Sequence, residues 1–143
     1  MIDSNKQIVR EYLEAGNRGE IAALLALLDR ERFRLCCHAA APIGYVLDYG
    51  ELERMLVRMA EATGGTFTIT IDQMTAEDDR VAVQAHSQST TAVGGTYANE
   101  YHFLFTLRNG AIIRLDEYLC SLTLVRNLDP AVWEEAKRLP EGS

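Results

Sequence analysis

Four residues in this sequence are the leading candidates for acid–base or nucleophilic chemistry: Tyr12, His38, His86 and Cys120. Either histidine could carry protons, because imidazole titrates near neutral pH. A histidine close to Cys120 would favour the thiolate, which is the nucleophilic form of cysteine. The alternatives are that Cys120 is a small inert cysteine and that His38 stands at a strand end in contact with water. We therefore treat a His86–Cys120 dyad and a His38 base as separate hypotheses.

The cysteines and histidines lack the spacing of a metal site. Two of the three cysteines, Cys36 and Cys37, are adjacent, which suits neither a disulfide framework nor a zinc motif. We expect reduced thiols, no metal and no cofactor.

Residues 96–122 are rich in aromatic side chains and read as a β-hairpin. Asn109-Gly110 separates two apolar runs, and both residues tolerate the positive φ that a tight hairpin turn requires. Because strand side chains alternate, one face of the first strand carries Tyr97, Asn99, Tyr101, Phe103, Phe105 and Leu107. This face predicts an apolar cavity with a few polar groups, in which Tyr101, Phe103 and Asn99 contact a substrate. Tyr118 on the returning strand and Gln88 on the preceding strand are the other predicted substrate contacts. The alternative, favoured for the two phenylalanines, is that they only fill the core.

The apolar pattern of the returning strand conflicts with a simple register. A two-residue turn would place Phe103 beside Asp116, whereas the apolar positions are Ile113, Leu115 and Leu119. Either a β-bulge shifts the second strand, or both faces of the hairpin are covered. We favour the bulge.

Three amphipathic helices are predicted over residues 4–15, 20–29 and 50–62, with Tyr12 on the inward side of the first. Strands are predicted over residues 32–39, 66–74 and 80–91, and a short C-terminal helix within residues 128–139. This order predicts an α+β domain in which a curved, mainly antiparallel sheet wraps around three N-terminal helices. The gap between the helices and the sheet is a natural blind pocket.

The length and net charge of the chain limit the classes of function that it can have. The 143 residues predict a single domain, and the net charge of −7 argues against a nucleic-acid partner. No apolar run has the length of a signal peptide or a membrane span, so we expect a cytoplasmic protein without a membrane partner.

The element order resembles the SnoaL-like and ketosteroid-isomerase-like branch of the nuclear transport factor 2-like superfamily. The resemblance covers nearly the whole chain and is strongest in YLEAGNRGEIAALLALL (residues 12–28) and GGTYANEYHFLFTLRNGAIIRLDEYL (residues 94–119). It implies a cystatin-like cone. Because this fold hosts isomerases, cyclases, dehydratases, epoxide hydrolases and members without catalysis, it does not by itself imply one reaction.

Residue by residue, the resemblance implies one clear role. Tyr12 occupies the position of the isomerase tyrosine that donates a hydrogen bond to the developing oxyanion, whereas the isomerase's carboxyl positions fall near Cys36 and Phe103. The epoxide-hydrolase-like positions fall at His86, Gln88 and Cys120. The late-strand aspartate of the cyclases also falls at Cys120, within Glu117-Tyr118-Leu119-Cys120. The resemblance thus implies that the acidic bases of all three reactions have been replaced.

We therefore expect a protein with a pocket for a small hydrophobic molecule, of polyketide, terpenoid or steroid type. In the first hypothesis it is an acid–base lyase or isomerase with Tyr12 as oxyanion donor and His38 or His86 as base. In the second it is a non-catalytic binding or dimerisation module. A mixed apolar and polar second face of the hairpin predicts a homodimer.

Overall fold

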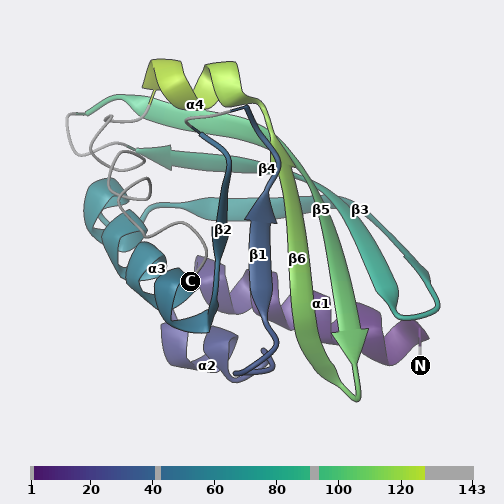
Figure 1. Ribbon diagram of the computed structural model, residues 1–143. Helices are drawn as coiled ribbons and strands as arrows, with labels where there is room; N and C mark the ends of the chain where they lie inside the picture. Colours follow the sequence, from purple (N-terminus) through teal and green to yellow (C-terminus); the bar gives the residue numbers. More distant parts are fainter. Residues whose placement is uncertain (1, 41–42, 91–93, 128–143) are drawn as a thin grey trace.

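The computed structural model describes residues 2–40, 43–90 and 94–127 (Figure 1). The helices are α1 (Ile2–Asn17), α2 (Ile21–Leu25), α3 (Tyr49–Thr63) and α4 (Ser121–Asn127). The strands are β1 (Arg34–Cys37), β2 (Tyr45–Leu47), β3 (Thr68–Glu77), β4 (Arg80–Thr90), β5 (Thr96–Arg108) and β6 (Ala111–Leu119).

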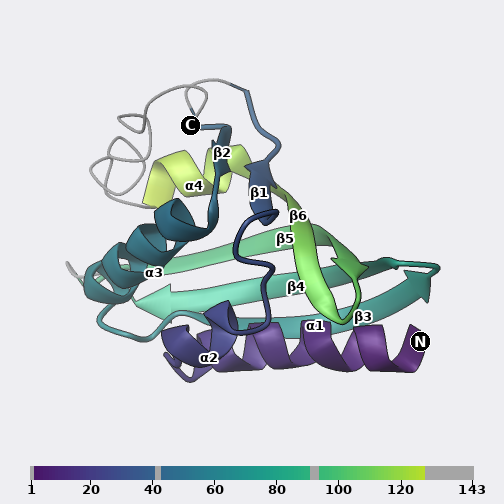
Figure 2. The same ribbon diagram turned by 60° about the horizontal axis from the view of Figure 1, so that its bottom comes forward.

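The six strands form one curved sheet in the order β2-β1-β6-β5-β4-β3. All neighbouring strands are antiparallel except β1 and β6, which run parallel. Helix α1 lies across one face of the sheet, and α2 and α3 lie on the same side (Figures 1 and 2). The predicted α+β architecture is therefore confirmed, with the main hydrophobic core between this concave face and the helices.

The β5–β6 hairpin carries the bulge that the sequence pattern favours. Arg108 pairs with Ala111 across the Asn109-Gly110 turn, but the register shifts by one residue before Thr106 pairs with Arg114. Ile113 is the extra residue. The shift lets Ile112 and Leu115 both face the core, because one additional residue restores the alternation of the strand.

Both ends of α3 lie where local sequence signals place them. Asp48 caps α3 by accepting a hydrogen bond from the Glu51 backbone N–H at 2.9 Å, and Gly64 ends the helix at a φ of +60°. Helix α2 is shorter than predicted. The Leu27 carbonyl accepts a hydrogen bond from the Ile112 N–H, so pairing with β6 replaces the next helical turn.

Two described elements were not predicted, β2 and α4. The short strand β2 follows Gly44 and pairs with β1, and α4 packs Leu124 against Tyr97. The C-terminal helix predicted within residues 128–139 lies outside the described residues. None of the helices in the described ranges is long and apolar enough to cross a membrane.

Candidate functional site

A cavity of about 210 Å³ lies between the concave face of the sheet and the helices. Its walls come from α1, α2, α3 and α4 and from the inward faces of β1, β2, β3, β5 and β6. Most of these side chains are apolar, and Phe103, Leu115 and Leu52 are typical of them. The cavity therefore suits a small hydrophobic molecule, as the sequence predicts.

Glu117 is the one charged side chain among the described residues that line this cavity. No hydrogen bond or ion pair to its carboxyl group occurs within the described part of the chain. Burial raises the pKa of Glu117 from its usual value of 4.5 to about 7. A carboxyl group with this pKa can accept and return a proton near neutral pH, so Glu117 is a candidate acidic base at a position to which the resemblance assigned none.

The bulge at Ile113 is what turns Glu117 inward. Beyond the bulge, Glu117 pairs with Phe103, whose ring stacks on the ring of Tyr101. In a hairpin without the bulge Phe103 would face Asp116 instead. The signal was present in the sequence, since Glu117 shares its strand parity with Leu115 and Leu119.

Four tyrosines surround the cavity: Tyr12, Tyr45, Tyr97 and Tyr101. All four have raised pKa values, mainly because they are buried, and the charge of Glu117 contributes in each case. They are therefore neutral hydrogen-bond donors at physiological pH. Tyr45 was not recognised from the sequence, because the preceding Pro42 and Gly44 suggested a loop.

Tyr12 lies where its predicted role requires. It is 6% exposed, lines the cavity and packs edge-on against Phe105 with ring centroids 5.4 Å apart. Within the described residues its hydroxyl has no hydrogen-bond partner. Its role as oxyanion donor stays a prediction.

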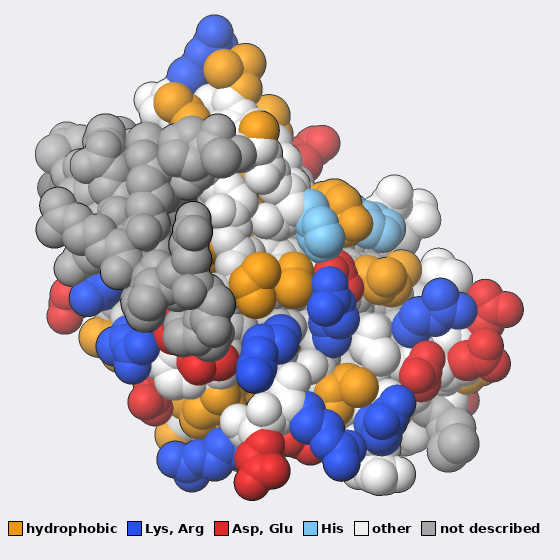
Figure 3. All heavy atoms as spheres, viewed as in Figure 1, with side chains coloured by type: hydrophobic (Ala, Val, Ile, Leu, Met, Phe, Trp, Pro, Cys, Tyr) orange, Lys and Arg blue, Asp and Glu red, His pale blue; other side chains and the backbone are white. Residues whose placement is uncertain are grey.

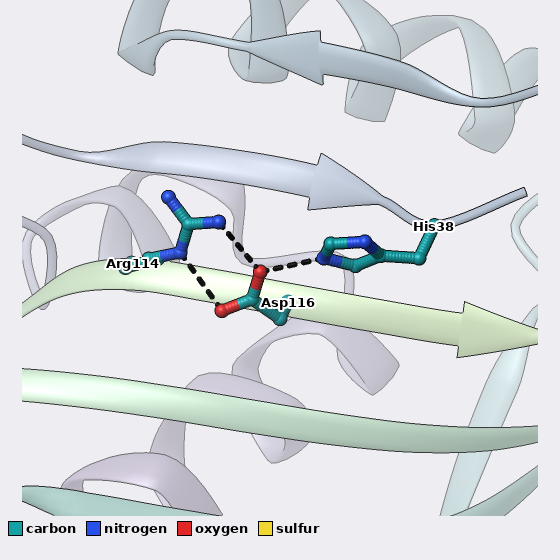
Figure 4. Close-up of polar contacts among 3 residues, drawn as sticks. All are labelled: His38, Arg114 and Asp116. Atoms are coloured by element: carbon teal, nitrogen blue, oxygen red, sulfur yellow. Dashed lines mark hydrogen bonds and ion pairs between the residues drawn. The ribbon is translucent and has the colours of Figure 1, made fainter.

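His38 lies on the opposite face of the sheet from the cavity. Its Nε2 is 2.7 Å from Asp116 Oδ1, and Arg114 donates two hydrogen bonds of 2.8 Å to the same carboxylate (Figure 4). The Arg114 guanidinium holds the pKa of Asp116 below its usual range, and His38 adds to this effect. The His38 ring also stacks on Tyr118, with centroids 4.5 Å apart. His38, Arg114, Asp116 and Tyr118 therefore form a cluster on the outer face of the sheet.

Figure 3 shows this outer face, where histidine side chains lie beside hydrophobic, acidic and basic ones. His86 is also outside the cavity and contacts Asp72 at 2.9 Å. Gln88 follows on the same exposed side of β4. Neither residue can contact a ligand held in the cavity.

Cys120 is exposed and lies between β6 and α4. Its thiol accepts a hydrogen bond from the Thr123 hydroxyl at 3.2 Å, which lowers the pKa of Cys120. His86 pairs with Asp72 rather than with this thiol, so the structure does not bring the proposed His86–Cys120 dyad together.

Of the predicted substrate-contacting residues, Tyr101 and Phe103 line the cavity. Asn99 is 4% exposed and is not part of the cavity lining, but it donates a hydrogen bond of 2.7 Å to the Tyr97 hydroxyl.

Among the described residues, no group of three or more His, Cys, Asp or Glu side chains is placed to hold a metal ion.

The SnoaL-like domain family matches residues 9–115 of this sequence, which is about three quarters of the chain. The chain belongs to the SnoaL-like domain family. The resemblance inferred from the sequence is therefore confirmed. No curated protein sequence matches this SnoaL-like domain.

Solved structures share the fold of this SnoaL-like domain at low sequence identity. An NTF2-like protein of unknown function from Burkholderia pseudomallei is 19% identical, with a TM-score of 0.76 over 87% of this chain and 97% of that one. A proposed SnoaL-like polyketide cyclase from Jannaschia sp. is 16% identical, with a TM-score of 0.74 over 91% and 94%. TerC, co-crystallised with polyporic acid, is 15% identical, with a TM-score of 0.76 over 87% and 97%. These similarities establish the NTF2-like fold.

Proposed function

We propose that this SnoaL-like domain is an acid–base enzyme of the lyase or isomerase type that moves a proton on a small hydrophobic carbonyl compound. Glu117 carries the proposal, because it is a carboxyl group with a pKa of about 7 in a mostly apolar cavity. A base is most effective when its pKa lies near the working pH.

In the proposed reaction the ionised Glu117 removes a proton from the carbon next to the carbonyl group. The C–H bond breaks, its electron pair moves toward the carbonyl oxygen, and an enolate forms. Tyrosine hydroxyl groups around Glu117 can donate hydrogen bonds to the negative oxygen. The protonated Glu117 then returns a proton to the same or another carbon, which completes an isomerisation or assists an elimination.

The side chains that line the cavity limit the charge of the substrate. Within the described lining there is no lysine, arginine or histidine to bind a phosphate or carboxylate group. An uncharged ring or short-chain ketone therefore fits better than an anion. The proposed polyketide cyclase and TerC with polyporic acid support a small organic ligand for this fold.

Hydrogen exchange tests the proposal without knowledge of the natural substrate. The probe is 2-acetylnaphthalene, whose methyl protons exchange with D₂O through the enolate and are followed by proton NMR. We expect the wild-type protein to accelerate this exchange and Glu117→Gln to lose at least about 100-fold of the acceleration.

Asp116→Asn is the matched control, because it removes the neighbouring carboxylate on the other face of the same strand. It should leave the exchange rate unchanged. Equal rates in wild type and Glu117→Gln would contradict the proposal. A probe that binds without exchange would favour the non-catalytic binding module.

A further inference from the structure

A chain of buried hydrogen bonds leads from the backbone of β5 and β6 to the hydroxyl groups of two cavity tyrosines. It begins at Asn99. The Oδ1 atom of Asn99 accepts hydrogen bonds from the backbone N–H groups of Glu100 at 2.8 Å and Cys120 at 3.2 Å. The amide nitrogen donates to the Cys120 carbonyl at 3.1 Å and to the Tyr97 hydroxyl at 2.7 Å.

These contacts fix which way the Asn99 amide points. Two backbone donors can only face its oxygen, and a backbone carbonyl can only face its nitrogen. The bond from Asn99 to Tyr97 therefore has one direction. The Tyr97 oxygen must accept it, so the proton of Tyr97 is free to point elsewhere.

Ser87 likewise makes the hydroxyl oxygen of the second tyrosine, Tyr101, a hydrogen-bond acceptor. Its hydroxyl oxygen accepts a hydrogen bond from the Asn99 backbone N–H at 3.2 Å and donates its own proton to the Tyr101 hydroxyl at 3.1 Å. Ser87 is 2% exposed, so water does not compete for these bonds. The Tyr101 oxygen is thus also an acceptor.

The Tyr97 and Tyr101 hydroxyl oxygens lie 3.2 Å apart, and one proton joins them. Each oxygen already accepts a bond from outside the pair, and the pair has two protons of its own. One proton is therefore left without an acceptor among the described residues. Both rings line the cavity, so a ligand bound there can accept this proton. Tyr101 is 8% exposed and Tyr97 only 1%, so Tyr101 is the better placed to present it.

We propose that Tyr101 is the hydrogen-bond donor that recognises a carbonyl oxygen of the ligand, and that Ser87, Asn99 and Tyr97 are positioning residues that hold its proton in the cavity. A buried donor without an acceptor costs free energy, and a ligand carbonyl removes that cost. The same arrangement disfavours a ligand that offers only a hydrogen-bond donor at this point. The inference rests on the cavity of the proposed function but not on proton transfer by Glu117.

A pair of probes of the same shape tests the recognition. 2-Acetylnaphthalene and 2-isopropenylnaphthalene differ in that a CH₂ group replaces the carbonyl oxygen, and neither measurement requires turnover. We expect the wild-type protein to bind the ketone about 3- to 10-fold more tightly than the alkene. Tyr101→Phe should remove this preference while it leaves alkene binding unchanged.

The positioning role is tested by the infrared carbonyl stretch of the bound ketone, labelled with ¹³C at the carbonyl. Donation from Tyr101 should lower this frequency in the wild-type protein. Tyr97→Phe and Ser87→Ala should each reverse part of the shift, because they remove bonds that polarise the Tyr101 hydroxyl. Ser89→Ala is the matched control, since the Ser89 hydroxyl bonds to the Tyr97 backbone carbonyl outside the network. It should leave the frequency unchanged.

Three results would overturn the proposal. These are a wild-type protein that does not distinguish the two probes, a ketone preference that survives Tyr101→Phe, and a carbonyl frequency that moves equally in Ser87→Ala and Ser89→Ala. Loss of hydrogen exchange in Glu117→Gln with an intact ketone preference would confirm both inferences separately. An intact preference without any exchange in wild type would refute only the proposed catalysis.

Discussion

Glu117 on β6 pairs directly with Phe103 on β5, which places its carboxyl group on the aromatic face of the hairpin. The adjacent residue, Asp116, points to the other side, where Arg114 and His38 hold it. Glu117 therefore faces a mostly apolar cavity, whereas Asp116 is bound by an arginine and a histidine on the outer face. Burial raises the pKa of Glu117 to about 7, whereas the Arg114 guanidinium lowers the pKa of Asp116.

The first prediction concerns the pH dependence of catalysis. If Glu117 is the base, kcat/KM for hydrogen exchange should rise with pH and level off above about pH 7, because only the ionised carboxylate can take the proton. Proton NMR in D₂O buffers of different pH measures this profile. A rate already constant below about pH 5 would mean that another group is the base.

The second prediction concerns the pH dependence of stability. The pKa of Glu117 is raised on folding, so its contribution to the free energy of unfolding is fully present below about pH 4.5 and is lost as pH rises through about 7. Glu117→Gln removes this loss. Relative to wild type, the variant should gain stability between about pH 4.5 and about pH 8.5, by up to about 3 kcal/mol.

Urea unfolding at both pH values measures the difference. The change with pH matters rather than the absolute stability, since glutamine packs differently from a protonated glutamate. Parallel pH profiles for wild type and Glu117→Gln would show that Glu117 ionises normally in the folded protein.

The third prediction concerns Tyr12. Tyr12→Phe keeps the ring against Phe105 and removes only the hydroxyl group. If that hydroxyl stabilises the developing oxyanion, the variant should bind 2-acetylnaphthalene nearly as well as wild type and lose about 100-fold in exchange rate. Thermal unfolding provides the control for folding. Unchanged exchange would remove Tyr12 from the mechanism and leave Tyr101 as the donor.

The fourth prediction is the homodimer expected from the sequence. The outer face of β2 and β6 exposes two large side chains, Val46 at 59% and Tyr118 at 46%. Burial of such groups against a second copy would be favourable. Light scattering at micromolar concentration should give twice the chain mass of 16.0 kDa. A mass of one chain would refute the prediction.

The elements with strong local signals were predictable from the sequence. Asn109-Gly110 fixes a turn, Gly64 ends a helix, and the alternation along residues 97–107 identifies the buried face of β5. The bulge was also inferred, because the apolar positions of β6 did not fit a simple register. Each of these signals acts over a few residues and needs no knowledge of distant contacts.

The site was harder to predict because its chemistry depends on which face a residue reaches. Glu117 resembles a surface glutamate in sequence, and only the register of β6 against β5 shows that it faces the cavity. His38 and His86 attracted attention as residue types, yet alternation along β1 and β4 places them on the outer face. Tyr45 lies on a strand of three residues, which is too short to give a pattern.

The extra residue Ile113 separates the hairpin into two halves that can vary independently in evolution or design. The turn determines the pairing of Arg108 with Ala111, whereas contacts beyond the bulge determine the pairing of Phe103 with Glu117. A change in loop length near the turn can be absorbed at the bulge without rotating the half of β6 that carries Glu117. Loop sequences could therefore diversify at the tip of the hairpin while the position of the cavity carboxyl group stays constant.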